Sequence, residues 1–348
     1  MGIGTFILVS IVKIVVAIGV LLTAVAYTVW LERKVVGHIQ NRWGPTRVGP
    51  FGLLQPLADG VKFIFKEDLI PPHAYKPLFI AAPMIALIFA LTSISVIPIG
   101  NWITVFGIHT PLEITDVNIG LLVVLGITSL GVYGVALAGW SSNSKYSLLG
   151  GLRASAQMVS YEISLGLSLV GVRILAGSFS LRDIVDAQAG TYWGFIPRWN
   201  IFQWPPQIIA FFIYLMAAYA ETNRIPFDLP EAETELVAGY HTEYSAMKFA
   251  MFFMAEYANM ITVASLATLL FLGGWHGPHR FGPPILQAIL PVFWFAVKIF
   301  AFLFLYIWVR GTLPRFRYDQ LMAFGWKFLL PLAIANLVIT ALIVALRA

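Results

Sequence analysis

The chain contains no cysteine among its 348 residues. Because iron–sulfur clusters and c-type haem are held through cysteine, neither group is expected on this chain, and a disulfide is excluded. Nothing resembles a glycine-rich phosphate loop or a dinucleotide-binding fingerprint, so nucleotide and flavin binding are not indicated. Any redox chemistry is therefore expected to come from a partner or a ligand, and we assign no catalytic residue to the isolated chain.

Charged residues are also scarce. They make up 11% of the chain, whereas hydrophobic residues make up 59%, and soluble domains average about 25% charged residues. This composition is typical of a polytopic membrane protein. His276 and His279 lie in a loop rich in glycine and proline, where an ordinary surface loop is far commoner than a metal site, so no metal is expected. The net charge of +5 gives no reason to expect nucleic acid as a partner.

The long apolar segments predict the fold. A membrane-spanning helix needs about 20 apolar residues. Such windows lie near residues 6–30, 78–99, 118–140, 157–177, 206–222, 249–272, 287–310 and 326–346. We therefore expect a single all-α integral membrane domain over residues 1–348, with about eight transmembrane helices.

Basic residues are distributed unevenly between the loops. They cluster in or beside four alternate connections, residues 31–77, 141–156, 223–248 and 311–325. Few lie on the other side: Arg182, Arg198, Arg280 and Arg347. Because inner loops are enriched in lysine and arginine, we expect these four connections inside and both termini outside.

The first inner loop includes a segment with helical periodicity. Leu54, Leu57, Val61 and Ile64 share one face, and polar residues occupy the others. The segment is too short and too polar to span a membrane. It predicts an amphipathic helix at the membrane surface, where it would meet a lipid-soluble substrate, although packing against protein alone would give the same pattern.

Acidic residues are concentrated between two apolar segments. Residues 221–245 contain a single basic residue, Arg224, and six carboxylates: Glu221, Asp228, Glu231, Glu233, Glu235 and Glu243. Ionised groups beside hydrocarbon are costly and tend to pair, titrate or serve transport. The alternative, a solvated loop, does not account for the apolar residues interleaved with these acids.

The charged residues inside the predicted spans include Lys13, Glu162, Glu256 and Lys298. Lys13 lies close enough to a helix end to reach the membrane surface, so a structural role is the simpler interpretation. Desolvation raises the pKa of a carboxyl group and a nearby cation lowers it. We therefore expect glutamates with Lys298 within reach to form a row able to pass protons, unless they form structural ion pairs.

Four long blocks resemble the H subunit of proton-translocating NADH:quinone oxidoreductase, respiratory complex I. They read LERKVVGHIQNRWGPTRVGPFGLLQPLADGVKFIFKED, GWSSNSKYSLLGGLRASAQMVSYEIS, AETNRIPFDLPEAETELVAGYHTEYSAMKFAMFFMAEY and VRGTLPRFRYDQLM. The resemblance runs from about Leu31 to Lys327. Trp43 departs from the family, in which a smaller or basic residue is common at this position.

The resemblance implies roles for particular residues. Residues that would line or shape a quinone tunnel are Glu32, Arg33, Arg42, Asp59, Phe227, Arg310 and Arg315. Residues that would form an acidic path toward antiporter-like subunits are Glu162, Glu221, Glu231, Glu233, Glu235, Glu243 and Glu256. Iron–sulfur clusters in a neighbouring peripheral-arm subunit would reduce the quinone, which is ubiquinone or menaquinone.

The sequence therefore predicts a membrane subunit that forms a quinone chamber and couples quinone reduction to proton translocation. Its expected partners are other membrane and peripheral-arm subunits and membrane lipid, in a bacterial plasma membrane rather than a mitochondrial inner membrane. The alternatives are the coupling subunit of an energy-converting hydrogenase, an autonomous cation/proton antiporter and a passive scaffold.

Overall fold

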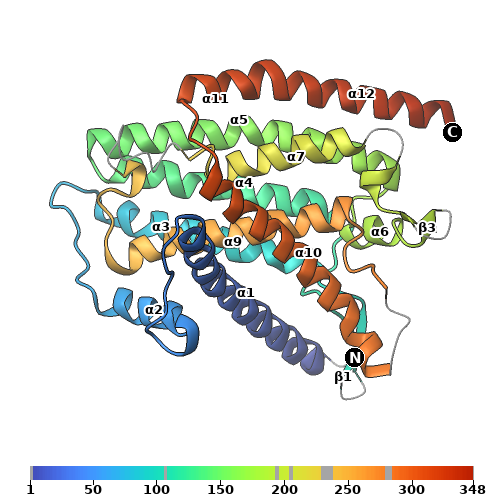
Figure 1. Cartoon of the computed structure of the whole chain (residues 1–348), viewed down its shortest axis with the longest axis horizontal. Helices are drawn as coiled ribbons and strands as arrows, with labels where there is room; N and C mark the ends of the chain where they lie inside the picture. The colour runs from blue at the N-terminus through green and yellow to red at the C-terminus, as the bar shows by residue number, and fades with distance from the viewer. Residues whose placement is uncertain are drawn as a thin grey trace.

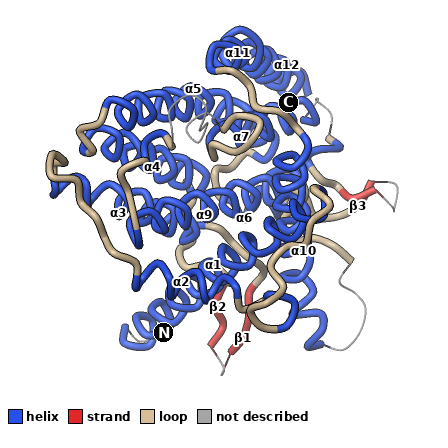
Figure 2. The backbone as a smooth tube through the Cα atoms, turned by 60° about the vertical axis from the view of Figure 1, so that its left-hand side comes forward, coloured by secondary structure: helices blue, strands red, loops and turns tan. Residues whose placement is uncertain are grey.

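The fold is a bundle of long helices, seen here in a computed structural model that describes residues 3–105, 108–192, 196–203, 207–228, 238–278 and 284–347. Figure 2 shows that strands contribute only short hairpins to the described residues. One hairpin pairs β1 (Trp102–Val105) with β2 (Ile108–Pro111), and the other pairs β3 (Thr191–Tyr192) with β4 (Ile196–Pro197).

Each predicted span coincides with a helical segment. In chain order these are α1 (Ile3–Ile39), α3 (Lys76–Ser93), α4 (Gly120–Ser141), α5 (Lys145–Ala176), α7 (Gln207–Glu221), α9 (Ala246–Phe271), α10 (Pro284–Thr312) and a last segment made of α11 (Tyr318–Phe324), the π-helical η5 (Gly325–Leu329) and α12 (Leu330–Arg347). Seven of them are long and apolar enough to cross a membrane, and α7 is a shorter apolar helix of 15 residues. The prediction of an all-α membrane protein is confirmed.

Shorter helices lie at the two ends of the bundle. They are η1 (Pro50–Gly52), α2 (Gln55–Phe65), η2 (Ile94–Val96), α6 (Leu181–Asp186), η3 (Asn200–Phe202) and η4 (Gly239–His241). Figure 1 shows both termini toward one end, near β1, α6 and β3, and α2 toward the other. We call these the terminal end and the α2 end. The alternation of the spans places residues 223–228 and the connection between α10 and α11 at the α2 end as well.

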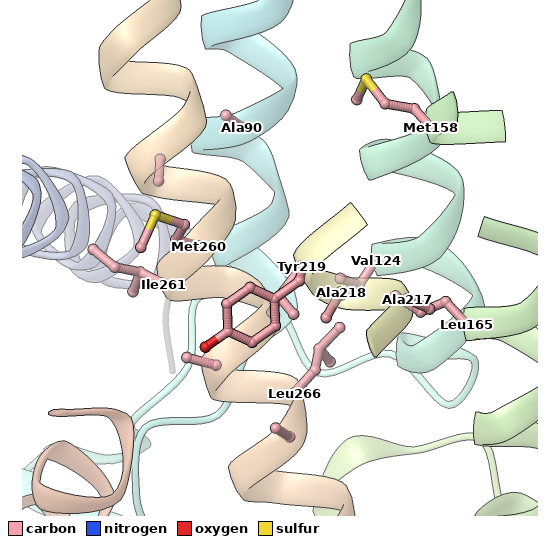
Figure 3. Close-up of a cluster of buried hydrophobic side chains, with 14 of the residues drawn as sticks. Ala90, Val124, Met158, Leu165, Ala217, Ala218, Tyr219, Met260, Ile261 and Leu266 are labelled. Carbon is pink, nitrogen blue, oxygen red and sulfur yellow. The ribbon is translucent and has the colours of Figure 1, made fainter. Parts of the chain in front are cut away.

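The interior is packed with small side chains. Figure 3 shows Ala90, Ala217 and Ala218 among larger buried residues contributed by α3, α4, α5, α7 and α9. A Cβ added to Gly139 of α4 would lie 3.0 Å from the Cα of Gly151 in α5. Since lipid tails are as apolar as leucine, helices in a membrane associate through such close backbone packing.

The helix predicted in the first inner loop is present as α2. Its apolar face is exposed in the isolated chain, with Leu57 and Ile64 exposed by 68% and 66%. An amphipathic helix with a free apolar face is suited to lie in a membrane surface or against another subunit. Its position relative to the lipid stays a prediction.

The connection predicted at residues 141–156 is shorter in the structure, because α5 begins at Lys145. The window 157–177 marked only its most apolar part. The helix also includes a first stretch with Lys145, Arg153 and glycines, which lowers hydropathy without ending a helix. α5 ends where Gly177 adopts a left-handed conformation, with φ of 71°.

The turn before α2 depends on Gly52. Its φ is +77°, and an added Cβ would collide with the Pro45 carbonyl oxygen. We expect Gly52→Ala to displace the loop of residues 44–53 and make it more susceptible to limited proteolysis in membranes. Gly60→Ala is the matched control, since Gly60 lies inside α2 with open space around it. Equal protection of both variants would contradict this prediction.

Candidate functional site

A buried carboxylate, Glu32 of α1, joins three helices at the α2 end. Its side chain accepts a hydrogen bond from the Tyr257 hydroxyl of α9 at 2.8 Å and forms an ion pair with Arg310 of α10. Arg224, which follows α7, lies 3.5 Å from the same carboxylate. Glu32 is only 7% exposed, so these partners replace water.

Arg224 connects Glu32 to a second carboxylate. Its Nε lies 2.7 Å from Glu256 Oε1, and its guanidinium lies 4.2 Å from the centre of the Tyr257 ring. Burial alone would lower the pKa of Arg224, but Glu256, Tyr257 and Glu32 hold it well above its usual value. We call Glu32, Arg224, Glu256, Tyr257 and Arg310 the Glu32 cluster. Its two carboxylates balance its two guanidinium groups.

The first inner loop adds a second ion pair near Glu32. Arg33, the next residue of α1, lies 2.5 Å from Asp59 of α2, which also accepts a hydrogen bond from Gln55 at 2.9 Å. This pair holds α2 against α1. Arg42 donates a hydrogen bond to Gln40 at 2.8 Å and is exposed.

The segment after Arg224 is fastened from two sides. The buried Phe227 ring stacks on Phe316 with centroids 5.7 Å apart, and Asp228 lies 3.3 Å from Arg315. From the other side, Gln157 of α5 donates a hydrogen bond to the Phe227 carbonyl at 2.9 Å. This segment therefore connects the Glu32 cluster to α5 and to the connection after α10.

Two glutamates predicted to carry protons lie near each other. Glu162 of α5 accepts a hydrogen bond from Ser129 of α4, and it interacts electrostatically with Glu221 at the end of α7. Glu221 also interacts with the buried tyrosines Tyr214 and Tyr306. The structure thus brings Glu162 and Glu221 into one group. Glu221 lies three residues before Arg224 of the Glu32 cluster.

The two lysines of the spans have structural partners at the terminal end. The Lys298 ammonium donates to the carbonyl oxygens of Leu272, Gly274 and His276 at 2.7 to 2.8 Å. These carbonyls follow α9, about 24 Å along its axis from Glu256 at 1.5 Å per residue. Lys298 therefore closes the end of α9 and is not within reach of Glu256.

Lys13 donates to the Glu113 carbonyl at 3.0 Å. The Glu113 carboxylate pairs with Arg182 at 2.6 Å. Burial raises the pKa of Glu113, and Arg182 opposes this shift. These contacts fasten the β1–β2 hairpin to α1 and α6, as expected for a structural role of Lys13.

Some predicted residues have no described role in the site. Glu231, Glu233 and Glu235 lie outside the described residues. Glu243 lies in the turn between η4 and α9. Among the residues that the structure describes, no group of three or more His, Asp or Glu side chains is arranged to hold a metal ion.

An apolar cavity of about 430 Å³ lies between α1, α9 and α10, with Ile94 and Ile99 also in its wall. It runs along α1 from Ala17 to Leu31, the residue before Glu32, and its other walls come from α9 and α10. Ligand pockets in proteins commonly have volumes of about 300 to 1,000 Å³. The cavity and most of the Glu32 cluster therefore come from the same three helices, α1, α9 and α10.

Arg224 and Tyr257 received no role from the sequence, although they contribute most contacts of the Glu32 cluster. One signal was present, because Arg224 is the single basic residue of the acidic segment. Gln157 gave no signal, since one amide in a long helix does not reveal which carbonyls it reaches.

The comparisons with known proteins decide the family. A family model described as NADH dehydrogenase matches residues 12–341. The chain belongs to the NADH dehydrogenase family. A relative from this family, an NADH-quinone oxidoreductase H subunit of Koribacter versatilis, is 72% identical over 99% of both chains.

Two further relatives in the family agree, and both are named as the H subunit of NADH-quinone oxidoreductase. The relative from Solibacter usitatus is 51% identical over 98% of both chains. The relative from Thermomicrobium roseum is 52% identical over 94% of both chains. The resemblance stated from the four sequence blocks is thereby confirmed.

Arg224 gives the sharpest test of the site. We expect Arg224→Leu to destabilise the protein by about 3–5 kcal/mol, because it leaves Glu32 and Glu256 buried with too little positive charge. Arg317→Leu is the control, since its pair with Asp319 is more than 70% exposed on both sides and is worth at most about 1 kcal/mol. Thermal unfolding of the assembled protein in detergent measures both. Similar midpoints for the two variants would refute the importance of the buried charges.

Proposed function

We propose that this chain lines a quinone-binding chamber of an NADH-quinone oxidoreductase and couples quinone reduction to proton translocation. The observation that carries this proposal is that the apolar cavity and the Glu32 cluster share α1, with Leu31 lining the cavity next to Glu32. An isoprenoid tail requires an apolar passage, and a quinone carbonyl requires hydrogen-bond donors where charge develops on reduction. The chain supplies both, in a family whose relatives are named for quinone oxidoreduction.

Each wall of the proposed chamber has a defined part. The cavity between α1, α9 and α10 would hold the tail, and Arg310, Tyr257 and the nearby Arg33–Asp59 pair would face the head group. Phe227 with Phe316 would give the passage an aromatic wall beside Arg315. Electrons would arrive from an iron–sulfur subunit of the peripheral arm, and this chain would bind, orient and shield the quinone.

Coupling would begin with charge balance. Reduction of a quinone adds negative charge until protons are bound, which disturbs a cluster whose two carboxylates and two guanidinium groups are matched. Arg224 contacts both Glu32 and Glu256, so a change at one carboxylate alters the other. The segment from Arg224 to Asp228 would carry this change toward Glu162, Glu221 and the glutamates of residues 231–235.

The predicted setting is part of the same proposal. The chain would lie in a bacterial plasma membrane with both termini outside, next to antiporter-like subunits. The α2 end would face the peripheral arm, and the apolar face of α2 would meet the lipid from which the quinone enters.

A photoreactive quinone with an isoprenoid tail tests the chamber in native membranes. We expect labelling within residues 31–68 or 221–245 that excess unlabelled quinone abolishes, because these segments contain Glu32 and Arg224. Peptides of α12 provide the background, since lipid-facing labelling there is not displaced. Absence of displaceable labelling in membranes with active electron transfer would favour a hydrogenase-like coupling subunit or a scaffold.

Glu162→Gln tests coupling. The amide keeps the size of the side chain and its bond to Ser129 but cannot titrate, so we expect an assembled complex with less proton translocation for each NADH oxidised. Proton uptake and NADH oxidation are measured together in inverted vesicles. Glu67→Gln is the control, because Glu67 is exposed. Normal translocation by Glu162→Gln would refute its role.

A further inference from the structure

One face of α5 is polar and buried through much of the bundle. Gln157, Tyr161, Ser164, Ser168 and Gly171 follow each other at intervals of four and three residues, which places them on one side of the helix. The four side chains are at most 1% exposed. Polar groups inside membrane spans are costly and commonly mark a functional path. We call this face the α5 polar stripe.

The stripe begins beside the Glu32 cluster. Gln157 donates to the carbonyls of Ala220 and Phe227 at 2.8 and 2.9 Å, so its amide is held at the end of α7. Tyr161 donates to the Leu321 carbonyl at 2.8 Å and packs against Gly325, the first residue of the π-helical segment. These two residues have protein partners.

The stripe ends in a polar group at the terminal end. Gln207, the first residue of α7, donates to Thr340 of α12 at 3.2 Å, and both are fully buried. Gly171 leaves room for this amide, because an added Cβ would lie 3.3 Å from Gln207 Oε1 and 3.9 Å from Asn336 Nδ2. Polar side chains of α7 and α12 therefore meet the α5 polar stripe at Gly171.

Three oxygen atoms on or beside the stripe have no hydrogen-bond partner among the described residues: Ser164 Oγ of α5, Gln207 Oε1 of α7 and Asn336 Oδ1 of α12. All three side chains are less than 5% exposed. If these residues served only to join helices, their polar atoms would be expected to bond to one another. Buried groups of this kind bind ordered water, which needs two to four polar partners.

We propose that α5, α7 and α12 enclose a file of bound water that conducts protons between the level of Glu162 and the terminal end. The nine residues from Glu162 to Gly171 span about 14 Å along the helix. Hydroxyl and amide groups orient water without titrating, so protons pass along the water. This route rests on the proposed coupling function, and it is separate from the contacts of Glu162 with α4.

Gly171→Val tests the route by placing an apolar side chain against Gln207 and Asn336 without removing a polar group. In inverted vesicles containing the whole complex, we expect NADH oxidation to continue and the proton-to-electron ratio to fall. Gly166→Val is the matched control on the same helix, because an added Cβ there meets nothing within 4 Å. Its ratio is expected to equal that of the wild type.

A second pair of variants separates conduction from structure. We expect Gln207→Leu to lower the proton-to-electron ratio. Gln207→Glu keeps a group that binds water, so we expect a ratio close to that of the wild type. If Gly171→Val prevents assembly, the two Gln207 variants test whether the stripe conducts protons. A reduced amount of complex with an unchanged ratio in Gln207→Leu would overturn the route and leave a purely structural role.

The outcome is distinguishable from failure of the proposed function. If the quinone probe labels the chamber and Glu162→Gln impairs translocation, a normal ratio in Gln207→Leu removes only the water route. If Glu162→Gln pumps normally while Gly171→Val and Gln207→Leu do not, the acidic path fails and conduction along the stripe is supported.

Discussion

The organisation of the α2 end depends on neutralising buried charge. Glu32 and Arg224 are buried, and Glu256 and Arg310, which pair with them, are partly buried. In such surroundings an isolated charge is unstable and a matched set is tolerated. Matching requires α1, α9, α10 and the segment after α7 to meet at one place. The same meeting brings Phe227, three residues after Arg224, against Phe316.

Packing between small residues and polar paths are linked in this bundle. Helices that approach through alanine and glycine leave little free volume, so a polar side chain of one helix reaches its neighbour where that neighbour lacks a side chain, as Gln207 does at Gly171. The same close packing brings Gln157 of α5 within reach of backbone carbonyls after α7. Tight packing therefore limits polar contacts between the helices to a few positions.

The sequence predicted the spans well because each contains a continuous apolar run. The hydropathy windows missed the more polar helical stretches beside these runs, at the end of α1, at the start of α5 and in α11. The site was less predictable. Glu32 and Arg310 were assigned by family resemblance, but their pairing joins residues 278 positions apart, and no periodicity reports such a contact. For Lys298 the sequence suggested the wrong partner. A lysine inside a span was expected near carboxylates, whereas its ammonium group binds backbone carbonyls.

Lys298 also has a mechanical consequence. Its three N–H groups bind three carbonyls that follow α9, while at the other end Tyr257 of α9 and Arg310 of α10 bind the same carboxylate. Helix α9 is thus tied to α10 at both of its ends. Two ties on opposite sides of the cavity oppose any spreading of α9 from α10, so we expect the width of the cavity to vary little.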